Sequence, residues 1–270
     1  MDVPDFNPTI VPEKRYLGKD RYFVIRDDTL IGGTKQRALY NHLIKFKAIR
    51  PDITELVYAG PDSGYAQIAL AYVAPYAGFK SRLFLQSLSK TPNKLTKRAI
   101  GYGAEYTLIQ NDLKTVTAKA RTYIEENPTS HLIPFGLDSK EFESELIDAL
   151  TIALKDVQEP KTLWLPIGSG TLLKCISQVW PNTFIKGVIV GRDIYWEDYD
   201  PKLRERVETY DAKAYNRRRY PGVGEYKFAR PIDKSLLPPY PSLATYDGKI
   251  WLFASKDLED GDYIWNVGKD

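Results

Sequence analysis

Apolar residues form short clustered runs that alternate with longer stretches in which they recur every three or four residues. The short runs are rich in β-branched and aromatic residues, which favours strands. Strands are predicted at residues 21–26, 55–59, 81–86, 105–109, 131–135, 162–166 and 185–190. Helices are predicted at residues 34–48, 64–77, 92–101, 113–126, 139–156 and 170–179. This alternation predicts an α/β fold in which mostly parallel sheets carry helices on both faces.

One break in this pattern is typical of a domain boundary. A predicted helix ends near Val157 and is followed by the polar, proline-containing segment 158–161. We therefore expect two lobes. Residues 192–240 are rich in tyrosine, proline and charge and have no clear periodicity, so we assign no element to them.

Composition excludes several classes of protein. The chain has 270 residues, of which 43% are hydrophobic and 27% charged, enough for a substantial core. No apolar run reaches the roughly 20 residues of a membrane helix, and the first twenty residues lack the apolar region of a secretory signal. Cys175 is the single cysteine, which fits a reducing compartment. We expect a cytoplasmic protein without a zinc site or other metal site.

Charge is unevenly distributed in the later part of the chain, although the net charge is only +3. Residues 193–211 hold seven acids and three bases, whereas residues 213–234 hold seven bases and two acids. A solvated, salt-bridged surface is the favoured interpretation. The alternative is that Arg217, Arg218 and Arg219 bind phosphates of a substrate or of a nucleic acid.

A glycine pair and a lysine, Gly32-Gly33-Thr34-Lys35, stand where a predicted strand meets a predicted helix. A lysine held partly away from water loses its proton more easily than a surface lysine, which favours formation of a Schiff base. A solvated lysine that opens a helix is the commoner case. This motif alone therefore does not decide between a Schiff-base lysine and a solvated one.

A second turn, Pro61-Asp62-Ser63-Gly64-Tyr65, follows a predicted strand and precedes an alanine-rich helix. The N–H groups and partial positive charge at the start of a helix suit a carboxylate. A simple N-cap role for Ser63 has equal weight at this point.

A third turn, Gly168-Ser169-Gly170-Thr171, joins a buried strand to a helix. Its glycines allow the backbone to approach an anion, and Ser169 and Thr171 supply hydroxyl donors. The turn lacks the Gly-Lys-Ser/Thr ending of a P-loop, which disfavours a nucleoside triphosphate. A fourth segment, residues 245–249, carries Tyr246 and Asp247; by itself it predicts an ordinary Asp-Gly turn between two strands.

In this order, the segments resemble motifs of fold type II (tryptophan synthase β-like) pyridoxal-phosphate enzymes, in the aminocyclopropane-carboxylate deaminase and D-cysteine desulfhydrase branch. Arg26-Asp27-Asp28 with the glycine pair and Lys35 resembles the segment that carries the cofactor lysine. Residues 168–171 resemble the Gly-Thr-Gly-Gly-Thr phosphate cup, and residues 245–249 resemble the C-terminal Tyr-Thr/Glu-Gly-Lys segment. The resemblance runs from about residue 21 to 251, with residues 192–240 poorly matched.

The resemblance implies a role for each candidate residue. It implies catalytic roles for Lys35, Ser63 and Tyr246, and a substrate-carboxylate site at Ser63, Gly64 and Tyr65. It implies cofactor binding by Lys35, Tyr65, Gly168, Ser169, Gly170, Thr171 and Asp247. The carboxylate of Asp247 would hold the ring nitrogen protonated, which makes the ring an electron sink. Gly64 and Tyr65 replace an asparagine that usually bonds the cofactor's phenolic oxygen.

The resemblance predicts a pyridoxal 5′-phosphate-dependent lyase or deaminase that acts at Cα of a small amino acid through a Lys35 aldimine, in a homodimer. It also predicts a large cofactor-binding domain of residues 1–44 and 151–270 and a small domain of residues 45–150. Two alternatives stay open. One is an enzyme that trims an amino acid attached to a modified nucleotide in viral DNA, suggested by Arg217–Arg219 and the altered turn at 63–65. The other is a non-catalytic protein with this fold.

Overall fold

The computed structural model describes residues 2–191, 193–212 and 230–269 and divides into two compact units. Unit 1 consists of residues 1–8 and 31–149, and unit 2 consists of residues 9–30 and 150–270. Residues 31–44, which we expected with the chain ends, belong to unit 1. The reason is local packing, because helix α1 (Gln36–Ile49) lies against α2 (Ala66–Val73) of that unit.

Unit 1 contains a parallel sheet in the order β5-β4-β3-β6. Its strands are β3 (Glu55–Pro61), β4 (Lys80–Gln86), β5 (Glu105–Ile109) and β6 (Ser130–Ile133). Its other helices are α3 (Lys94–Gly101), α4 (Leu113–Glu126) and α5 (Lys140–Ala153), which crosses the unit boundary. Short 3₁₀ helices are η2 (Gly33–Lys35), η3 (Ala74–Ala77) and η4 (Phe135–Leu137).

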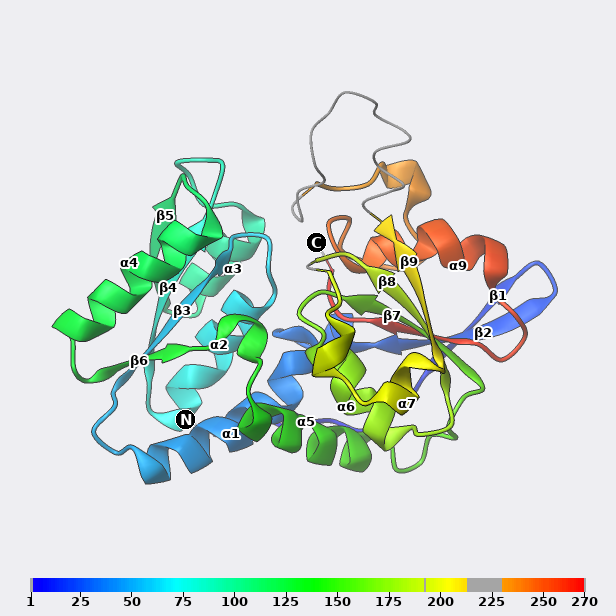
Figure 1. Cartoon of the computed structure of the whole chain (residues 1–270), viewed down its shortest axis with the longest axis horizontal. Coiled ribbons are helices and arrows are strands. Elements are labelled where there is room, and N and C mark those ends of the chain that lie inside the picture. Colours follow the sequence, from blue (N-terminus) through cyan, green and yellow to red (C-terminus); the bar gives the residue numbers. More distant parts are fainter. Residues whose placement is uncertain (1, 192, 213–229, 270) are drawn as a thin grey trace. The chain divides into compact units, whose positions relative to one another are not determined.

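Helices cover both faces of this sheet. Figure 1 shows α4 on one face and α2 and α3 on the other. On the α4 face, Val57 and Ala59 of β3 pack with Val116 and Ala120. Burial on both sides explains why almost all of β3 is buried and reads as a continuous apolar run.

Unit 2 contains a larger sheet in the order β1-β2-β10-β7-β8-β9. Its strands are β1 (Glu13–Leu17), β2 (Asp20–Arg26), β7 (Thr162–Ile167), β8 (Phe184–Ile189), β9 (Val207–Asp211) and β10 (Tyr263–Asn266). Its helices are α6 (Thr171–Val179), α7 (Pro201–Arg204) and α9 (Trp251–Asp257), with 3₁₀ helices η1 (Asp27–Thr29), η5 (Trp196–Asp198), η6 (Lys234–Leu236) and η7 (Asp247–Ile250). Only β1 and β2 pair antiparallel among these strands, so the mostly parallel α/β prediction is confirmed.

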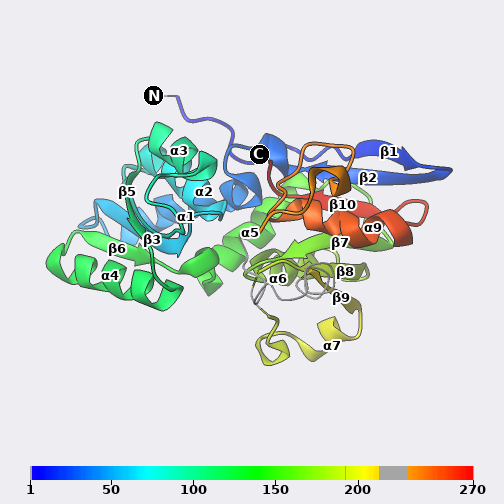
Figure 2. The same ribbon diagram turned by 90° about the horizontal axis from the view of Figure 1, so that it is seen from above.

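Strand β10 places the end of the chain at the centre of the unit 2 sheet, between β2 and β7 (Figures 1 and 2). Its Ile264 packs in one core with Trp164 of β7 and with Ile250 and Ala254. Because β2, β10 and β7 run parallel, their carboxyl ends meet at one edge of the sheet. Ligands of open α/β sheets bind outside this edge.

The structure corrects several sequence predictions. Strands β1, β9 and β10 were not predicted. The predicted helix at 64–77 ends at Val73 and continues as a 3₁₀ helix, because Pro75 cannot extend the α-helical hydrogen bonding. Residues 247–257 form η7 and α9 instead of a turn between two strands.

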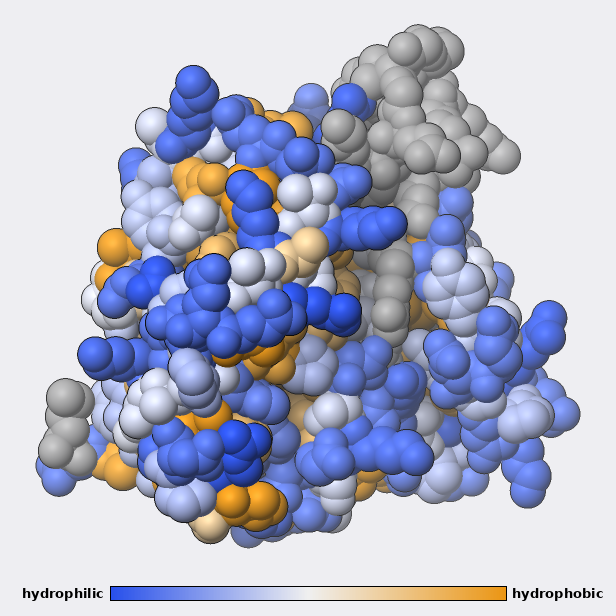
Figure 3. All heavy atoms as spheres, turned by 60° about the vertical axis from the view of Figure 1, so that its left-hand side comes forward, coloured by the Kyte–Doolittle hydropathy of each residue, from blue (hydrophilic) through white to orange (hydrophobic). Residues whose placement is uncertain are grey.

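The face of the molecule in Figure 3 is mainly hydrophilic, with hydrophobic residues in separate small groups. Large exposed hydrophobic residues include Ile44, Leu88 and Tyr106. These residues do not identify an interface between two copies of the chain, so the homodimer stays a prediction. Within the described ranges, no helix combines the length and apolar character needed to cross a membrane.

Candidate active site

Lys35 ends the 3₁₀ turn η2, directly before helix α1, and it is half-buried. Gly33 has φ +65°, a left-handed conformation that favours glycine. A Cβ on Gly32 would lie 2.6 Å from the Cα of Ala69 in α2, so only glycine fits there. The Gly32 N–H donates to Oε1 of Gln36 at 3.0 Å. Backbone packing and this hydrogen bond together hold the turn that presents Lys35.

Arg98 of α3 connects the Lys35 turn to the second predicted turn. Its guanidinium donates to the hydroxyl of Tyr65 at 3.0 Å and to the carbonyl of Ile31 at 3.4 Å. No role was predicted for Arg98 from the sequence. The described contacts make it a link between two candidate motifs of unit 1.

Ser63 is 6% exposed, and its Oγ has no hydrogen-bond partner among the residues that the structure describes. The N-cap interpretation is wrong, because α2 is preceded by Tyr65 and has no side-chain cap. The carbonyl of Asp62 accepts from Nε2 of Gln67 and from Nδ2 of Asn93. Burial raises the pKa of the Asp62 carboxyl, although hydrogen bonds from Ser87 and Asn93 oppose the rise.

The glycine turn of unit 2 lies directly before helix α6. Gly170 has φ +93° and is the N-cap residue, while Oγ of Ser169 and Oγ1 of Thr171 lie 2.9 Å apart. Any Cβ on Gly170 would overlap the hydroxyl of Tyr199. Lys174 lies in the first turn of α6, with its amine 5.6 Å from the Tyr199 ring centroid. Two hydroxyls, a helix N-terminus and a nearby lysine suit a phosphate.

Tyr246 joins the third and fourth predicted motifs. Its hydroxyl lies so close to Gly168 that a Cβ there would overlap it. Burial raises the pKa of Tyr246, the charge of Asp247 adds to the rise, and a backbone hydrogen bond from Gly168 opposes it. Motifs that are far apart in the sequence therefore meet within unit 2.

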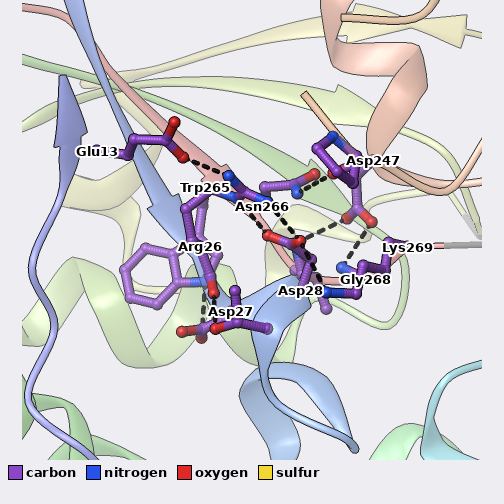
Figure 4. A network of polar contacts seen from close by, with 12 residues as sticks. Glu13, Arg26, Asp27, Asp28, Asp247, Trp265, Asn266, Gly268 and Lys269 are labelled. Carbon is purple, nitrogen blue, oxygen red and sulfur yellow. Dashed lines mark hydrogen bonds and ion pairs between the residues drawn. The ribbon is translucent and has the colours of Figure 1, made fainter. Parts of the chain in front are cut away.

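Asp247 is 2% exposed and lies in the polar network of Figure 4. Its Oδ1 accepts from the N–H of Val267 at 3.2 Å, and its Oδ2 accepts from the N–H of Gly268 at 2.8 Å. Burial raises the pKa of Asp247 well above its ordinary value, and the charge of Asp28 adds to the rise. A carboxyl group has further lone pairs, so Asp247 can also bond a ring nitrogen.

Figure 4 also shows ion pairs in the same polar network. Arg26 binds Asp28 through Nε and Nη2, at 2.6 Å and 2.8 Å, and also pairs with Glu13. The amine of Lys269 lies 3.7 Å from Oδ2 of Asp28. Asp27 accepts from the indole N–H of Trp265 at 3.1 Å. The Arg26-Asp27-Asp28 motif is therefore part of the surroundings of Asp247.

Lys249 was not predicted to have a chemical role, yet it is the most buried lysine described. Its side chain is 0% exposed, and burial lowers its pKa to about 7. It lies on η7, two residues after Asp247.

The predicted site residues fall in both units. Lys35 and residues 63–65 lie in unit 1, whereas residues 168–171, Tyr246 and Asp247 lie in unit 2. That they form one site stays a prediction. The Arg217–Arg219 patch lies outside the described residues. Over the described ranges, no group of three or more His, Cys, Asp or Glu residues is placed to hold a metal ion.

No protein-family model matches the sequence, and no match is found among curated proteins. Solved structures do match. An ACC deaminase homologue has 16% identity and a TM-score of 0.74, over 98% of this chain and 91% of the other. An O-acetylserine-dependent cystathionine beta-synthase from Helicobacter pylori has 17% identity and a TM-score of 0.66, over 100% and 96% of the two chains.

A fungal L-serine ammonia-lyase from Rhizomucor miehei is also similar, with 15% identity and a TM-score of 0.66 over 98% and 95% of the two chains. These likenesses extend over nearly the whole of each chain. At such low identity they establish the architecture. The chain therefore has the fold of the fold type II pyridoxal-phosphate enzymes, as its motifs predicted.

Proposed function

We propose that this chain is a pyridoxal 5′-phosphate-dependent lyase or deaminase that acts at Cα of a small amino acid. The observation that carries the proposal is the meeting of two predicted motifs in unit 2. The hydroxyl of Tyr246 packs against Gly168 of the glycine turn, and the buried acid Asp247 directly follows Tyr246 in the sequence. The fold, which is shared with an ACC deaminase homologue and an L-serine ammonia-lyase, supports the same reaction class.

The donor set of the glycine turn fits a phosphate. Ser169 and Thr171 provide hydroxyl groups, and α6 provides the N-terminal end of a helix of nine residues. Asp247 fits the other end of the cofactor, since a buried carboxyl group can keep a ring nitrogen protonated. Bound pyridoxal 5′-phosphate supplies an aldehyde that reacts with amines and a ring that accepts electrons from a bond broken at Cα.

The residues of the chain would divide the remaining work. Lys35 would hold the aldehyde through its amine and carry a proton at Nζ to and from the substrate. Tyr246 would hold a proton at its hydroxyl, because burial keeps this phenol neutral at ordinary pH. Ser63 would offer a hydroxyl whose oxygen has no described partner, with Gly64 and Tyr65 completing the turn for the substrate carboxylate.

Cofactor uptake tests the proposal first. Purified protein should gain an absorption band at the edge of the visible range on addition of pyridoxal 5′-phosphate, and Lys35→Ala should abolish it. Lys45→Ala is the matched control, because Lys45 is an exposed lysine of α1 that pairs with Glu145. Loss of the band in both variants, or its retention in Lys35→Ala, would contradict the role of Lys35.

Turnover tests the second part. A panel of D- and L-amino acids should include one that releases ammonia or another leaving group in the wild type but not in Lys35→Ala. Uptake of the cofactor without turnover of any amino acid would favour the non-catalytic alternative. The nucleotide-trimming alternative stays a prediction, because its basic patch, Arg217–Arg219, lies outside the described ranges.

A further inference from the structure

Asp28 is a buried carboxylate that the proposed reaction does not use. Its side chain is 0% exposed, and Arg26 binds both of its oxygens. Lys269 lies 3.7 Å from Oδ2 on a further side. A bidentate arginine pair fixes the orientation of a carboxylate and compensates its charge where water is excluded. Asp28 is therefore a carboxylate of fixed orientation in the interior of unit 2, paired with Arg26 and Lys269.

The end of the chain connects Asp28 to Asp247. Gly268 donates its N–H to Asp247, and the next residue, Lys269, pairs with Asp28. Figure 4 shows both carboxyl groups beside this C-terminal segment. The negative charge of Asp28 raises the pKa of Asp247 beyond the effect of burial. The two acids are thus electrostatically coupled, although they come from opposite ends of the sequence.

Other charged or titratable groups also lie near Asp247. They are the phenols of Tyr240 and Tyr246 and the two cations that pair with Asp28, which are Arg26 and Lys269. Burial raises the pKa of both phenols, so they are neutral near pH 7. The charge balance at Asp247 therefore depends chiefly on Asp28 and on the two cations paired with it.

We propose that Asp28 is a positioning residue that acts through Asp247. Two neighbouring carboxylates resist becoming negative together unless a cation joins them. A ligand whose ring nitrogen carries a proton supplies that cation, whereas a ring without a basic nitrogen does not. The pair therefore selects a protonated pyridine. The identity of the ligand rests on the proposed function; the coupling of the two carboxyl groups does not.

The first experiment uses the protein without added ligand and needs no enzymatic activity. Carboxyl-carbon NMR would follow the titration of Asp247 in the wild type and in Asp28→Asn. We expect Asp28→Asn to lower the pKa of Asp247, because a like charge is removed. Asp27→Asn is the matched control. Asp27 is equally buried, but it accepts from Trp265 and is not among the causes of the Asp247 shift.

A second variant keeps the inference testable if Asp28→Asn does not fold. Lys269→Met removes a cation that partly compensates Asp28, from a side chain that is 38% exposed. It should shift the pKa of Asp247 upward, in the opposite direction from Asp28→Asn. An unchanged pKa of Asp247 in the variants that fold, or an equal shift of this pKa in Asp27→Asn, would overturn the coupling.

The ligand experiment compares pyridoxal 5′-phosphate with its deaza analogue, in which carbon replaces the ring nitrogen. Asp28→Asn should weaken binding of pyridoxal 5′-phosphate severalfold, because Asp247 loses the neighbour that positions it, and should leave binding of the analogue unchanged. Equal weakening of both would overturn the selection of a protonated ring. If the wild type binds neither compound, the proposed function fails, and with it the ligand assigned to the pair; the NMR titration still decides the coupling.

Discussion

Lys35 in unit 1 lies two residues after Gly33 and Lys249 in unit 2 directly follows Gly248, each in a candidate motif, but the two lysines differ in burial. Lys35 is half-buried at the start of a helix. Lys249 is 0% exposed, and burial lowers its pKa to about 7. The property expected of a reactive lysine is therefore found on a residue that an aldehyde cannot reach.

The comparison shows that access and neutrality are separate requirements for a Schiff-base lysine. Burial disfavours the charged form of an amine and so makes it nucleophilic, but complete burial also excludes the partner. A half-buried position such as that of Lys35 allows access. The turn at Gly32 packs closely on Ala69. This packing fixes the backbone position from which the Lys35 side chain extends.

The largest expected effect is the location of the covalent adduct. After addition of pyridoxal 5′-phosphate and reduction with borohydride, mass spectrometry of peptides should find the added mass on Lys35 alone. Lys35→Ala should lose the adduct completely, and Lys249→Met should keep it. An adduct on Lys249 would show that the buried amine becomes accessible, and the distinction between the two lysines would fail.

The second effect is on the pH dependence of stability. Between about pH 7 and pH 10.5 the unfolded chain binds a proton at Lys249 that the folded protein does not, so stability rises with pH in this window. The rise should be on the order of 4 kcal/mol. Urea unfolding across this range should show it in the wild type and not in Lys249→Met. Lys256→Met, an exposed lysine of α9, is the control and should follow the wild type.

The third effect concerns the packing that presents Lys35. Gly32→Ala would bring a Cβ 2.6 Å from Cα and 2.8 Å from Cβ of Ala69. Forcing the Gly32 turn away from α2 should lower the free energy of unfolding by about 1–3 kcal/mol. Gly101→Ala is the control, since a Cβ there meets no atom within 4 Å. Equal stability of the two variants would mean that the Lys35 turn adapts freely.

The smallest effect is expected at Tyr246. Tyr246→Phe removes the hydroxyl that takes part in the hydrogen bond with Gly168, which should lower the unfolding free energy by about 1 kcal/mol. Tyr195→Phe, at a residue that is 56% exposed, should change stability little. If Tyr246→Phe is as stable as wild type, the contact between the third and fourth motifs contributes nothing to folding.

Local pattern predicted much of the fold. The strand at 105–109 and the helix at 113–126 have the bounds expected from their apolar spacing. Strand β10 could not be predicted, because its four residues form a shorter run than those of the predicted strands. It exists because β2 and β7 pair with it on both sides. The role of Arg98 could not be predicted either, because its hydrogen bonds to Tyr65 and Ile31 join segments that are distant in the sequence.

The sequence by itself determined the alternation of strands and helices, the glycine turns and the order of the motifs that resemble one enzyme fold. These features depend on backbone conformation and on side chains a few residues apart, so the local sequence determines them. Tertiary structure decided which acids are coupled, as in Asp28 with Asp247, and which lysine has a lowered pKa, as in Lys249. Desolvation and Coulomb interaction depend on neighbours from distant parts of the chain, and only folding brings those neighbours together.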